Sequence, residues 1–141
     1  MTPTQVKLIQ ESFAKVAPVS EQAAALFYGR LFEIAPEVKP LFKGDMREQG
    51  RKLMGTLAVV VNGLADLNAI LPAASALAKR HVAYGVVPGH YAPVGAALLW
   101  TLERGLGAQW TQELAAAWAA AYATLSGFMI GEAYGRPAAA E

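Results

Sequence analysis

The chain has 141 residues, of which 55% are hydrophobic and 16% are charged, and its formal net charge is +1 at pH 7. So small a charge argues against a nucleic-acid-binding protein, because phosphate backbones are bound by clustered lysines and arginines. The absence of cysteine excludes disulfides, thiolate metal sites and cysteine nucleophiles, and it agrees with a cytoplasmic location.

The first predicted helix begins with a capping box, in which Thr2 is the cap, Pro3 the first helical residue and Gln5 the third. Pro18 ends this helix. Ser20 is expected to cap a second helix, which ends near Pro36. The apolar stripes of the two helices consist of Val6, Ile9, Phe13 and Val16, and of Ala24, Phe27, Tyr28, Leu31 and Phe32.

A short helical turn is expected at Pro36–Phe42, followed by a loop at Lys43–Asp45. A longer helix starts at about Met46 and weakens at Asn62–Gly63. One side of this helix carries Gln49, Leu53, Leu57, Val60 and Val61. That spacing favours a helix over a strand, despite the strand propensity of three consecutive valines.

The next helix is predicted from Leu67 to about His81, and Pro72 either kinks it or marks a new start. Gly85 breaks the chain after it. Another helix begins at Pro88, and Thr111 is expected to cap the last one. Their apolar stripes are Tyr91, Val94, Leu98 and Leu102, and Leu114, Trp118, Tyr122, Leu125 and Met129.

The last predicted helix contains an uncharged stretch, Leu114–Gly131, which is barely long enough to cross a membrane. Much of this stretch is alanine. Trp118 and Tyr122 lie within it rather than at its ends, where membrane proteins concentrate aromatic residues. We therefore predict a buried core helix and no membrane span.

The pattern as a whole predicts six or seven helices and no strand. The expected fold is an all-α domain over residues 1–134, with its helices packed in pairs around one core. Residues 135–141 are alanine-rich after Gly135 and are expected to fray. The excess of hydrophobic residues is compatible with an apolar ligand pocket or a partner surface, or simply with the abundance of alanine.

The two histidines, His81 and His90, are the only candidates for a nitrogen ligand to a metal or cofactor. His81 follows Leu77 by four positions and therefore faces the core. A histidine there is either a satisfied core residue or a ligand whose second ring nitrogen is hydrogen-bonded. Because Gly85 ends the helix soon afterwards, the edge of a flat cofactor would fit beside His81. His90 lies in a turn, where exposure is usual, and is the weaker candidate.

Two polar residues lie within apolar stripes. Tyr28 is either a core tyrosine bonded to the backbone or a hydroxyl directed at a diatomic ligand in a cavity. Gln49 is either a solvated amide near a helix start or a second hydrogen-bonding group in a pocket. Six basic residues near these helices form a solvated face or pair with carboxylates at a cofactor's edge. They are Lys43, Arg47, Arg51, Lys52, Lys79 and Arg80.

Several segments together resemble the globins, and within them the single-domain bacterial globins related to the haem domain of flavohaemoglobins. These segments are Leu26–Phe32, Pro36–Phe42, Arg51–Met54, Lys79–Val86, His90–Leu99 and Trp118–Tyr122. The stretch from His81 to Gly95 is the most specific, and the chain looks most similar to single-domain globins of methane-oxidising extremophiles. The resemblance implies a globin fold of six to seven helices around a pocket for haem b (iron protoporphyrin IX).

The resemblance also implies roles for individual residues. His81 corresponds to the histidine that ligates the haem iron, and Phe42 to a phenylalanine that packs against the haem. Tyr28 and Gln49 correspond to the distal residues that hydrogen-bond bound oxygen. The other cofactor-binding residues are Leu53 and Leu57 on the distal side, Val86, Tyr91 and Val94 on the proximal side, and Leu77 and Tyr84.

The chain departs from the family at the last helix. In the family, a tyrosine at the position of Tyr91 pairs with a glutamate and raises the basicity of the ligating histidine. Here Ala133 occupies the expected glutamate position, and Glu132 lies one residue earlier, about 100° away around a helix. This pairing is therefore expected only if the helix end is irregular.

These correspondences imply a haem protein that binds oxygen reversibly at a five-coordinate-type iron. Its expected role is oxygen storage, or a nitric oxide dioxygenase activity that converts nitric oxide to nitrate. Flavohaemoglobins also have flavin- and NAD-binding domains, which are not found in this sequence, so turnover is expected to need an external electron donor or reductase. The alternatives are a haem-based gas sensor that acts through a separate partner, and a haem-free helical interaction module.

Overall fold

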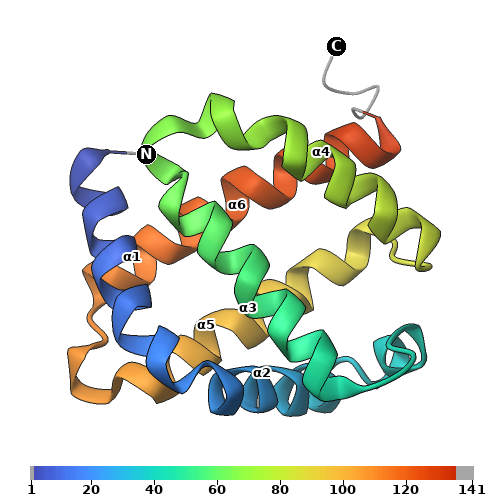
Figure 1. Ribbon diagram of the computed structural model, residues 1–141, viewed down its shortest axis with the longest axis horizontal. Coiled ribbons are helices and arrows are strands. Elements are labelled where there is room, and N and C mark those ends of the chain that lie inside the picture. Colours follow the sequence, from blue (N-terminus) through green and yellow to red (C-terminus); the bar gives the residue numbers. More distant parts are fainter. Residues whose placement is uncertain (1, 136–141) are drawn as a thin grey trace.

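The computed structural model describes residues 2–135, which fold into six α-helices connected by short 3-10 turns, with no strand in this range (Figure 1). The helices are α1 (Pro3–Val16), α2 (Ser20–Ile34), α3 (Met46–Asn62), α4 (Leu67–Ala83), α5 (Tyr91–Leu106) and α6 (Gln112–Tyr134). The predicted all-α fold is confirmed. Fraying was predicted for residues 135–141. Of these, only Gly135 lies within the described residues.

Two of the three predicted helix caps are confirmed. The Thr2 hydroxyl accepts a hydrogen bond from the Gln5 amide at 3.1 Å, and the Gln5 side chain accepts one from the Thr2 amide. Thr111 accepts in the same way from the Leu114 amide at 3.1 Å. The prediction for Ser20 is wrong, because a 3-10 turn leads directly into α2 and Ser20 already has helical dihedral angles, φ −58° and ψ −35°.

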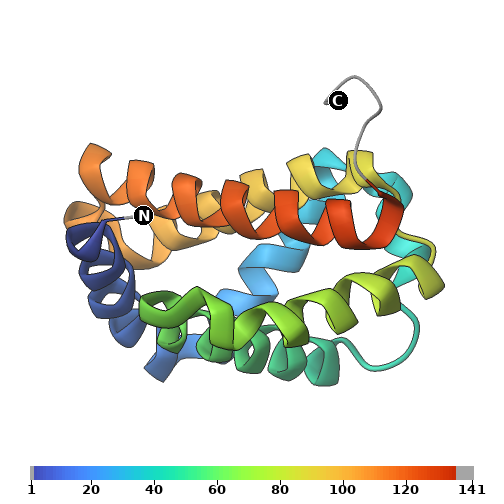
Figure 2. The ribbon, with the colours of Figure 1, turned by 90° about the horizontal axis from the view of Figure 1, so that it is seen from above.

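The helices form two layers. Figure 2 shows α5 and α6 over α3 and α4, with α1 at one end of the molecule. Across the layers, α4 packs mainly against α6, and α2 packs against both α5 and α3. Between α3 and α4 lies the turn Leu64–Asp66, and from this turn the two helices diverge towards the opposite end of the molecule (Figure 1).

Pro72 does not mark a new helix start, since α4 is continuous from Leu67 to Ala83. The proline lies in the second turn, at an exposed position. α4 therefore reaches as one rigid element from the turn after α3 to the segment that carries His81.

The buried residues fall into two clusters. The large cluster joins α1, α2, α3, α5 and the first half of α6, and includes Ile9, Leu31, Val61, Ala97 and Trp118. The small cluster consists of Ala74 and Ala78 of α4, Tyr91 of α5 and Met129 of α6, with partly buried residues around them. The helix that carries His81 is thus fastened to α6 and to the start of α5, whereas α3 belongs to the other cluster.

α6 is buried along one side, as expected for a core helix whose apolar residues form one stripe. Its buried residues are Leu114, Ala117, Trp118 and Met129. By length and composition alone, α6 would qualify as a membrane span, and α3 with α4 would qualify as a bent one. The exposed side of α6 consists largely of alanine, glycine and other small residues, which lose little by remaining in contact with water.

α5 and α6 approach each other closely at Gly95. A Cβ atom at this position would lie 2.6 Å from Cε2 of Tyr122. The Tyr122 ring therefore lies directly against the backbone of α5, and its hydroxyl donates a hydrogen bond to the carbonyl of Tyr91 at 2.6 Å. This contact fixes the start of α5 relative to α6.

Gly95→Ala is expected to lower the free energy of unfolding by about 1–3 kcal/mol, because the added methyl group overpacks this contact. The matched control is Gly55→Ala in α3, where a Cβ would have no heavy atom within 4 Å. There, alanine is expected to stabilise the helix by about 0.5–1 kcal/mol. Urea unfolding of both variants measures the two effects, and equal values would contradict the proposed close contact.

Candidate functional site

Tyr28 is the centre of an aromatic group formed by α2 and the turn that follows it. Its ring lies 5.1 Å from that of Phe27, 5.2 Å from that of Phe42 and 6.0 Å from that of Phe32, measured between centroids. The Tyr28 side chain is buried, and burial raises the pKa of its hydroxyl to about 12. The hydroxyl therefore carries its proton at neutral pH and acts as a hydrogen-bond donor.

The Tyr28 hydroxyl lies beside the start of α3. It donates to the backbone carbonyl of Gln49 at 3.3 Å, which is long for a bond between two oxygen atoms. The structure thus places the Tyr28 hydroxyl next to the backbone of Gln49. A weakly engaged donor can turn to a stronger acceptor at small cost.

A glycine explains why these two residues meet. A Cβ atom at Gly50 would lie 2.9 Å from the Cβ of Ala24, so α2 and α3 cross in close contact at this pair. Tyr28 lies one turn after Ala24, and Gln49 is adjacent to Gly50. Sequence reasoning missed Gly50, although a glycine inside a predicted helix is a signal of close packing.

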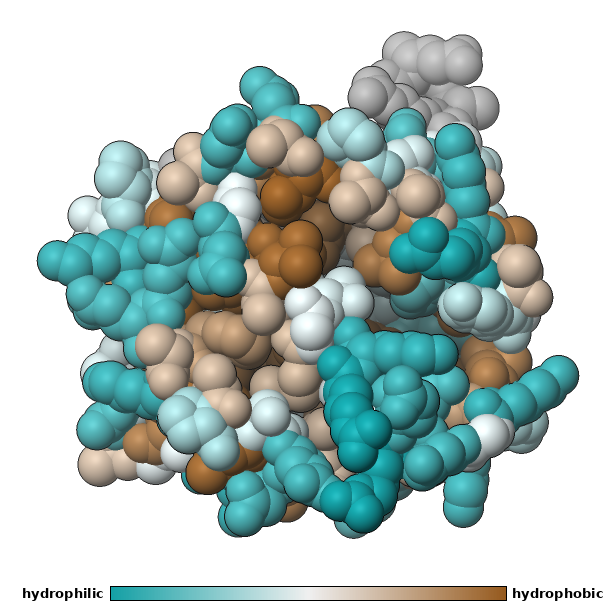
Figure 3. Space-filling view, viewed as in Figure 1, coloured by the Kyte–Doolittle hydropathy of each residue, from teal (hydrophilic) through white to brown (hydrophobic). Residues whose placement is uncertain are grey.

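α3 carries the predicted apolar wall. Leu53 and Leu57 follow Gln49 at intervals of four residues, and both are half-buried against the large cluster. Phe42 is half-buried in the same cluster. Figure 3 shows hydrophobic side chains gathered in a depression on this face of the molecule, over the region between α3 and α4.

His81 lies near the end of α4, and its protonation is determined by one hydrogen bond. Nδ1 lies 2.8 Å from the carbonyl oxygen of Leu77. A carbonyl only accepts, so Nδ1 carries a proton, and in the neutral ring Nε2 therefore keeps a free lone pair. Burial lowers the pKa of His81, although the bond to Leu77 acts in the opposite direction. A neutral imidazole with a free Nε2 is the form that binds metals.

Two tyrosines lie beside the His81 ring. The Tyr91 ring is 6.4 Å away and inclined by only 26°, and the Tyr84 ring is 6.1 Å away and inclined by 48°. Tyr91 is buried, whereas Tyr84 remains 58% exposed. Of the predicted cofactor-binding residues, Tyr84 is therefore the one that the structure leaves at the surface.

The turn after His81 has the geometry of a Schellman motif. Gly85 adopts φ +95°, its amide donates to the carbonyl of Val82, and the Val86 amide donates to the carbonyl of His81, both at 3.0 Å. The predicted break at Gly85 is confirmed. Because a positive φ favours glycine, this residue fixes the last turn of α4 and with it the position of His81.

Glu132, the glutamate near the end of α6, makes no hydrogen bond with Tyr91. Glu132 is exposed and accepts a hydrogen bond from the Ser75 hydroxyl of α4 at 2.8 Å. The Tyr91 hydroxyl is buried, and it has no hydrogen-bond partner among residues 2–135. The expected departure from the family pattern is therefore present in the structure.

The remaining predicted apolar residues pack against one or the other of the two clusters. Leu77 and Val86 pack against the small cluster, and Val94 packs against the large one. His90 is a poorer ligand candidate. Its Nδ1 accepts a hydrogen bond from the Val87 amide at 3.2 Å, so in the neutral ring the proton lies on Nε2 and neither nitrogen has a free lone pair.

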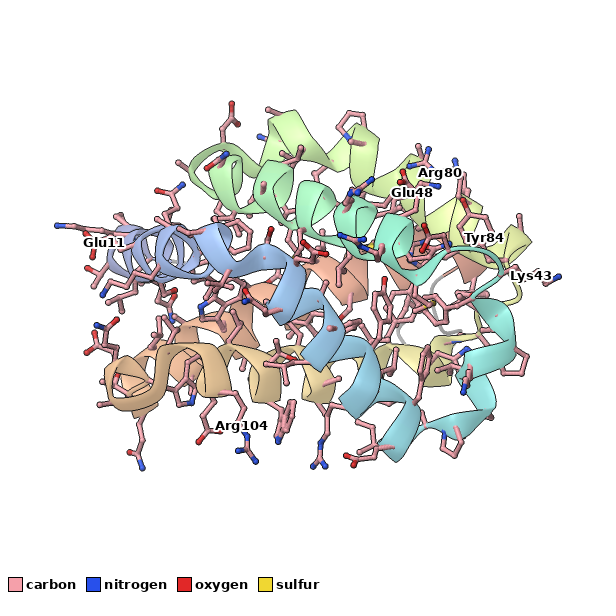
Figure 4. All side chains as sticks on the ribbon, turned by 60° about the horizontal axis from the view of Figure 1, so that its bottom comes forward. Glu11, Lys43, Glu48, Arg80, Tyr84 and Arg104 are labelled. Atoms are coloured by element: carbon pink, nitrogen blue, oxygen red, sulfur yellow. The ribbon has the colours of Figure 1, made fainter. Side chains whose placement is uncertain are left out.

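Basic residues lie near the open end of α3 and α4. Figure 4 shows Lys43, Glu48, Arg80 and Tyr84 at one end of the molecule. Arg47 pairs with Glu21 at 2.7 Å, and Arg51 pairs with Glu48 at 3.2 Å. Within the described part of the chain, the other four predicted basic residues make no ion pair. They are Lys43, Lys52, Lys79 and Arg80.

These residues fit a haem. A single histidine suits a metal that a planar cofactor already chelates, because the cofactor supplies the other ligands. Both clusters carry half-buried apolar side chains, and beside the small cluster lie the His81 ring and the buried Tyr91 hydroxyl, which has no hydrogen-bond partner among residues 2–135. The four basic residues that make no ion pair within the described part of the chain are suited to bind the carboxylates of such a cofactor.

The comparisons with known proteins agree with this geometry. The sequence model of the Globin family matches residues 25–129. The flavohemoprotein of Bordetella parapertussis is 34% identical over 137 residues, which cover 93% of this chain and 34% of that protein. The flavohemoprotein of Rhodopirellula baltica is 30% identical over 129 residues, which cover 89% of this chain and 32% of that protein. The chain thus spans about a third of the length of these relatives.

A solved structure matches the fold over nearly the whole length of both chains. The bacterial globin from Campylobacter jejuni superposes with a TM-score of 0.80 at 26% sequence identity. The match covers 93% of this chain and 95% of that one.

The raised pKa of Tyr28 predicts an alkaline loss of stability. Below pH 10.0 the phenol is protonated in both states, whereas above it the unfolded chain loses a proton that the folded protein retains until about 12. The free energy of unfolding therefore falls over this range, and Tyr28→Phe is expected to show a shallower fall. Urea unfolding between these pH values, with the exposed Tyr84→Phe as control, measures the slopes; identical slopes for Tyr28→Phe and wild type would contradict the burial.

Proposed function

This chain belongs to the globin family, and we propose that it binds oxygen reversibly for storage or for the oxidation of nitric oxide to nitrate. Membership of the family implies a haem cofactor and a gas-binding protein. As part of the proposal, the cofactor is haem b. When bound, haem supplies the iron that takes up the gas. The observation that carries the proposal is the neutral His81 imidazole, which keeps Nε2 free near a buried phenol.

We propose that His81 is the iron ligand. The bond from Nδ1 to the Leu77 carbonyl orients the ring and fixes its tautomer, as partners of ligating histidines commonly do. Since this acceptor is a neutral carbonyl rather than a carboxylate, His81 remains an ordinary imidazole ligand. Such a ligand suits reversible gas binding better than peroxidase-like chemistry.

Tyr28 and Gln49 are the proposed distal residues. The phenol remains protonated, and its bond to the Gln49 carbonyl is long, so the hydroxyl is available to an anionic acceptor. Gln49 offers an amide donor from the start of α3. A hydrogen bond to a charged acceptor is worth about 1.5–3 kcal/mol. Two such donors favour slow oxygen release, and therefore storage or detoxification over transport.

Apolar residues on both sides hold the cofactor and exclude water in this proposal. Phe42, Leu53 and Leu57 would cover the distal side. On the other side the proposed contacts are Leu77, Val86, Tyr91 and Val94, with Tyr84 at the exposed edge. The unpaired cations Lys43, Lys52, Lys79 and Arg80 are candidates to bind the cofactor's carboxylates.

Sustained oxidation of nitric oxide needs electrons. We propose that an external electron donor or reductase, acting on the protein in the cytoplasm, supplies them. The flavohemoproteins that this chain resembles are about three times longer, and this chain corresponds to only part of them.

His81→Ala is expected to abolish stable haem binding, because it removes the proposed ligand. The matched control is His90→Ala, which removes the other histidine and is expected to retain haem. The ratio of Soret absorbance to protein absorbance after purification with added haem measures both. Equal haem content in the two variants would rule out His81 as the ligand.

Tyr28→Phe is expected to speed oxygen release about tenfold, because it removes one hydrogen bond to a charged acceptor. Carbon monoxide carries little charge when bound, so its release rate is expected to remain nearly unchanged and serves as the control. Stopped-flow displacement measures both rates, and mixing with nitric oxide is expected to yield less nitrate from the variant. An unchanged oxygen release rate would show that Tyr28 does not face the ligand.

A further inference from the structure

A side chain of α6 reaches the turn that ends α4 just after His81. Tyr134, the last residue of α6, donates a hydrogen bond from its hydroxyl to the carbonyl of Val86. The amide of the same Val86 donates to the carbonyl of His81 at 3.0 Å. Val86 therefore connects the last turn of α6 with the last turn of α4.

α6 reaches the other side of His81 as well. The Tyr91 ring lies nearly parallel to the imidazole, and the carbonyl of Tyr91 accepts a hydrogen bond from Tyr122 of α6. Two tyrosines of α6 thus hold the two segments that flank His81.

The carboxylate of Glu132, near the end of α6, takes no part in this arrangement. Glu132 lies on another side of the helix, where it accepts a hydrogen bond from Ser75, two turns before His81 in α4. Glu132 therefore fastens the middle of α4 to α6, whereas Tyr134 fastens its end.

We propose that Tyr134 is a positioning residue for His81, and that it takes the place of a carboxylate behind the ligand. This inference rests on the proposed function, since it requires His81 to ligate iron. A neutral phenol bonded to a backbone carbonyl adds no negative charge near the imidazole. Tyr134 therefore acts on the geometry of the ligand, by holding the Schellman turn closed, and leaves its basicity unchanged.

The hydrogen bond between Tyr134 and Val86 is tested by amide hydrogen exchange in Tyr134→Phe. This variant keeps the ring and removes only the donor to Val86. The Val86 amide is expected to exchange about tenfold faster, because the turn opens more readily once one hydrogen bond is lost. Glu132→Gln is the control on the same helix, and is expected to leave Val86 exchange unchanged. If the Val86 amide of Tyr134→Phe exchanged at the same rate as in the wild-type protein, the proposed link between Tyr134 and Val86 would be overturned.

The effect on the ligand is tested by resonance Raman spectroscopy of the ferrous haem-loaded protein. Tyr134→Phe is expected to broaden the iron–histidine stretching band and move it to lower frequency, since His81 is held less firmly. Glu132→Gln is expected to leave the band in place. An unchanged band in Tyr134→Phe, or a shift confined to Glu132→Gln, would overturn the proposed role. Absence of the band from the wild-type protein would instead refute ligation by His81, and the role of Tyr134 with it.

Discussion

The hydrogen bond between His81 Nδ1 and the Leu77 carbonyl determines what the site can do. It places a proton on Nδ1 and directs Nε2 away from the helix, while burial lowers the pKa of the ring and so favours its neutral form. Both partners lie in the last turns of α4, so the helix must keep its regular geometry up to its end for this bond to form. The Schellman turn at Gly85 provides this end, and the packing of α4 against α6 holds it in place.

The division of the interior into two clusters follows from the same arrangement. α4 packs against α6 and the start of α5, whereas α3 packs against α2, so His81 and Tyr28 belong to separate parts of the core. Two close contacts at glycine fix these parts: Gly50 lets α2 cross α3, and Gly95 lets Tyr122 lie against α5. A planar apolar cofactor bound between the large and the small cluster would join them into one continuous core.

The sequence predicts the helices well, because apolar spacing, the capping box at Thr2 and the break at Gly85 are local signals. Ser20 was misjudged, since a preceding 3-10 turn already gives it helical geometry. The meeting of Tyr28 with Gln49 was predicted through family resemblance, whereas its cause, the crossing at Gly50, requires two helices in space. Likewise, no local pattern could show that Glu132 binds Ser75 or that Tyr134 reaches Val86, because these partners are far apart in sequence.

The central claim is that haem lies between the two clusters with His81 as its iron ligand, and a crystal structure of the haem-loaded protein tests it most directly. Anomalous scattering locates the iron without reference to the protein. The account predicts iron bonded to His81 Nε2, with the Tyr28 hydroxyl on the opposite face of the haem. Iron bonded to another residue, or Tyr28 on the same face as His81, would contradict it.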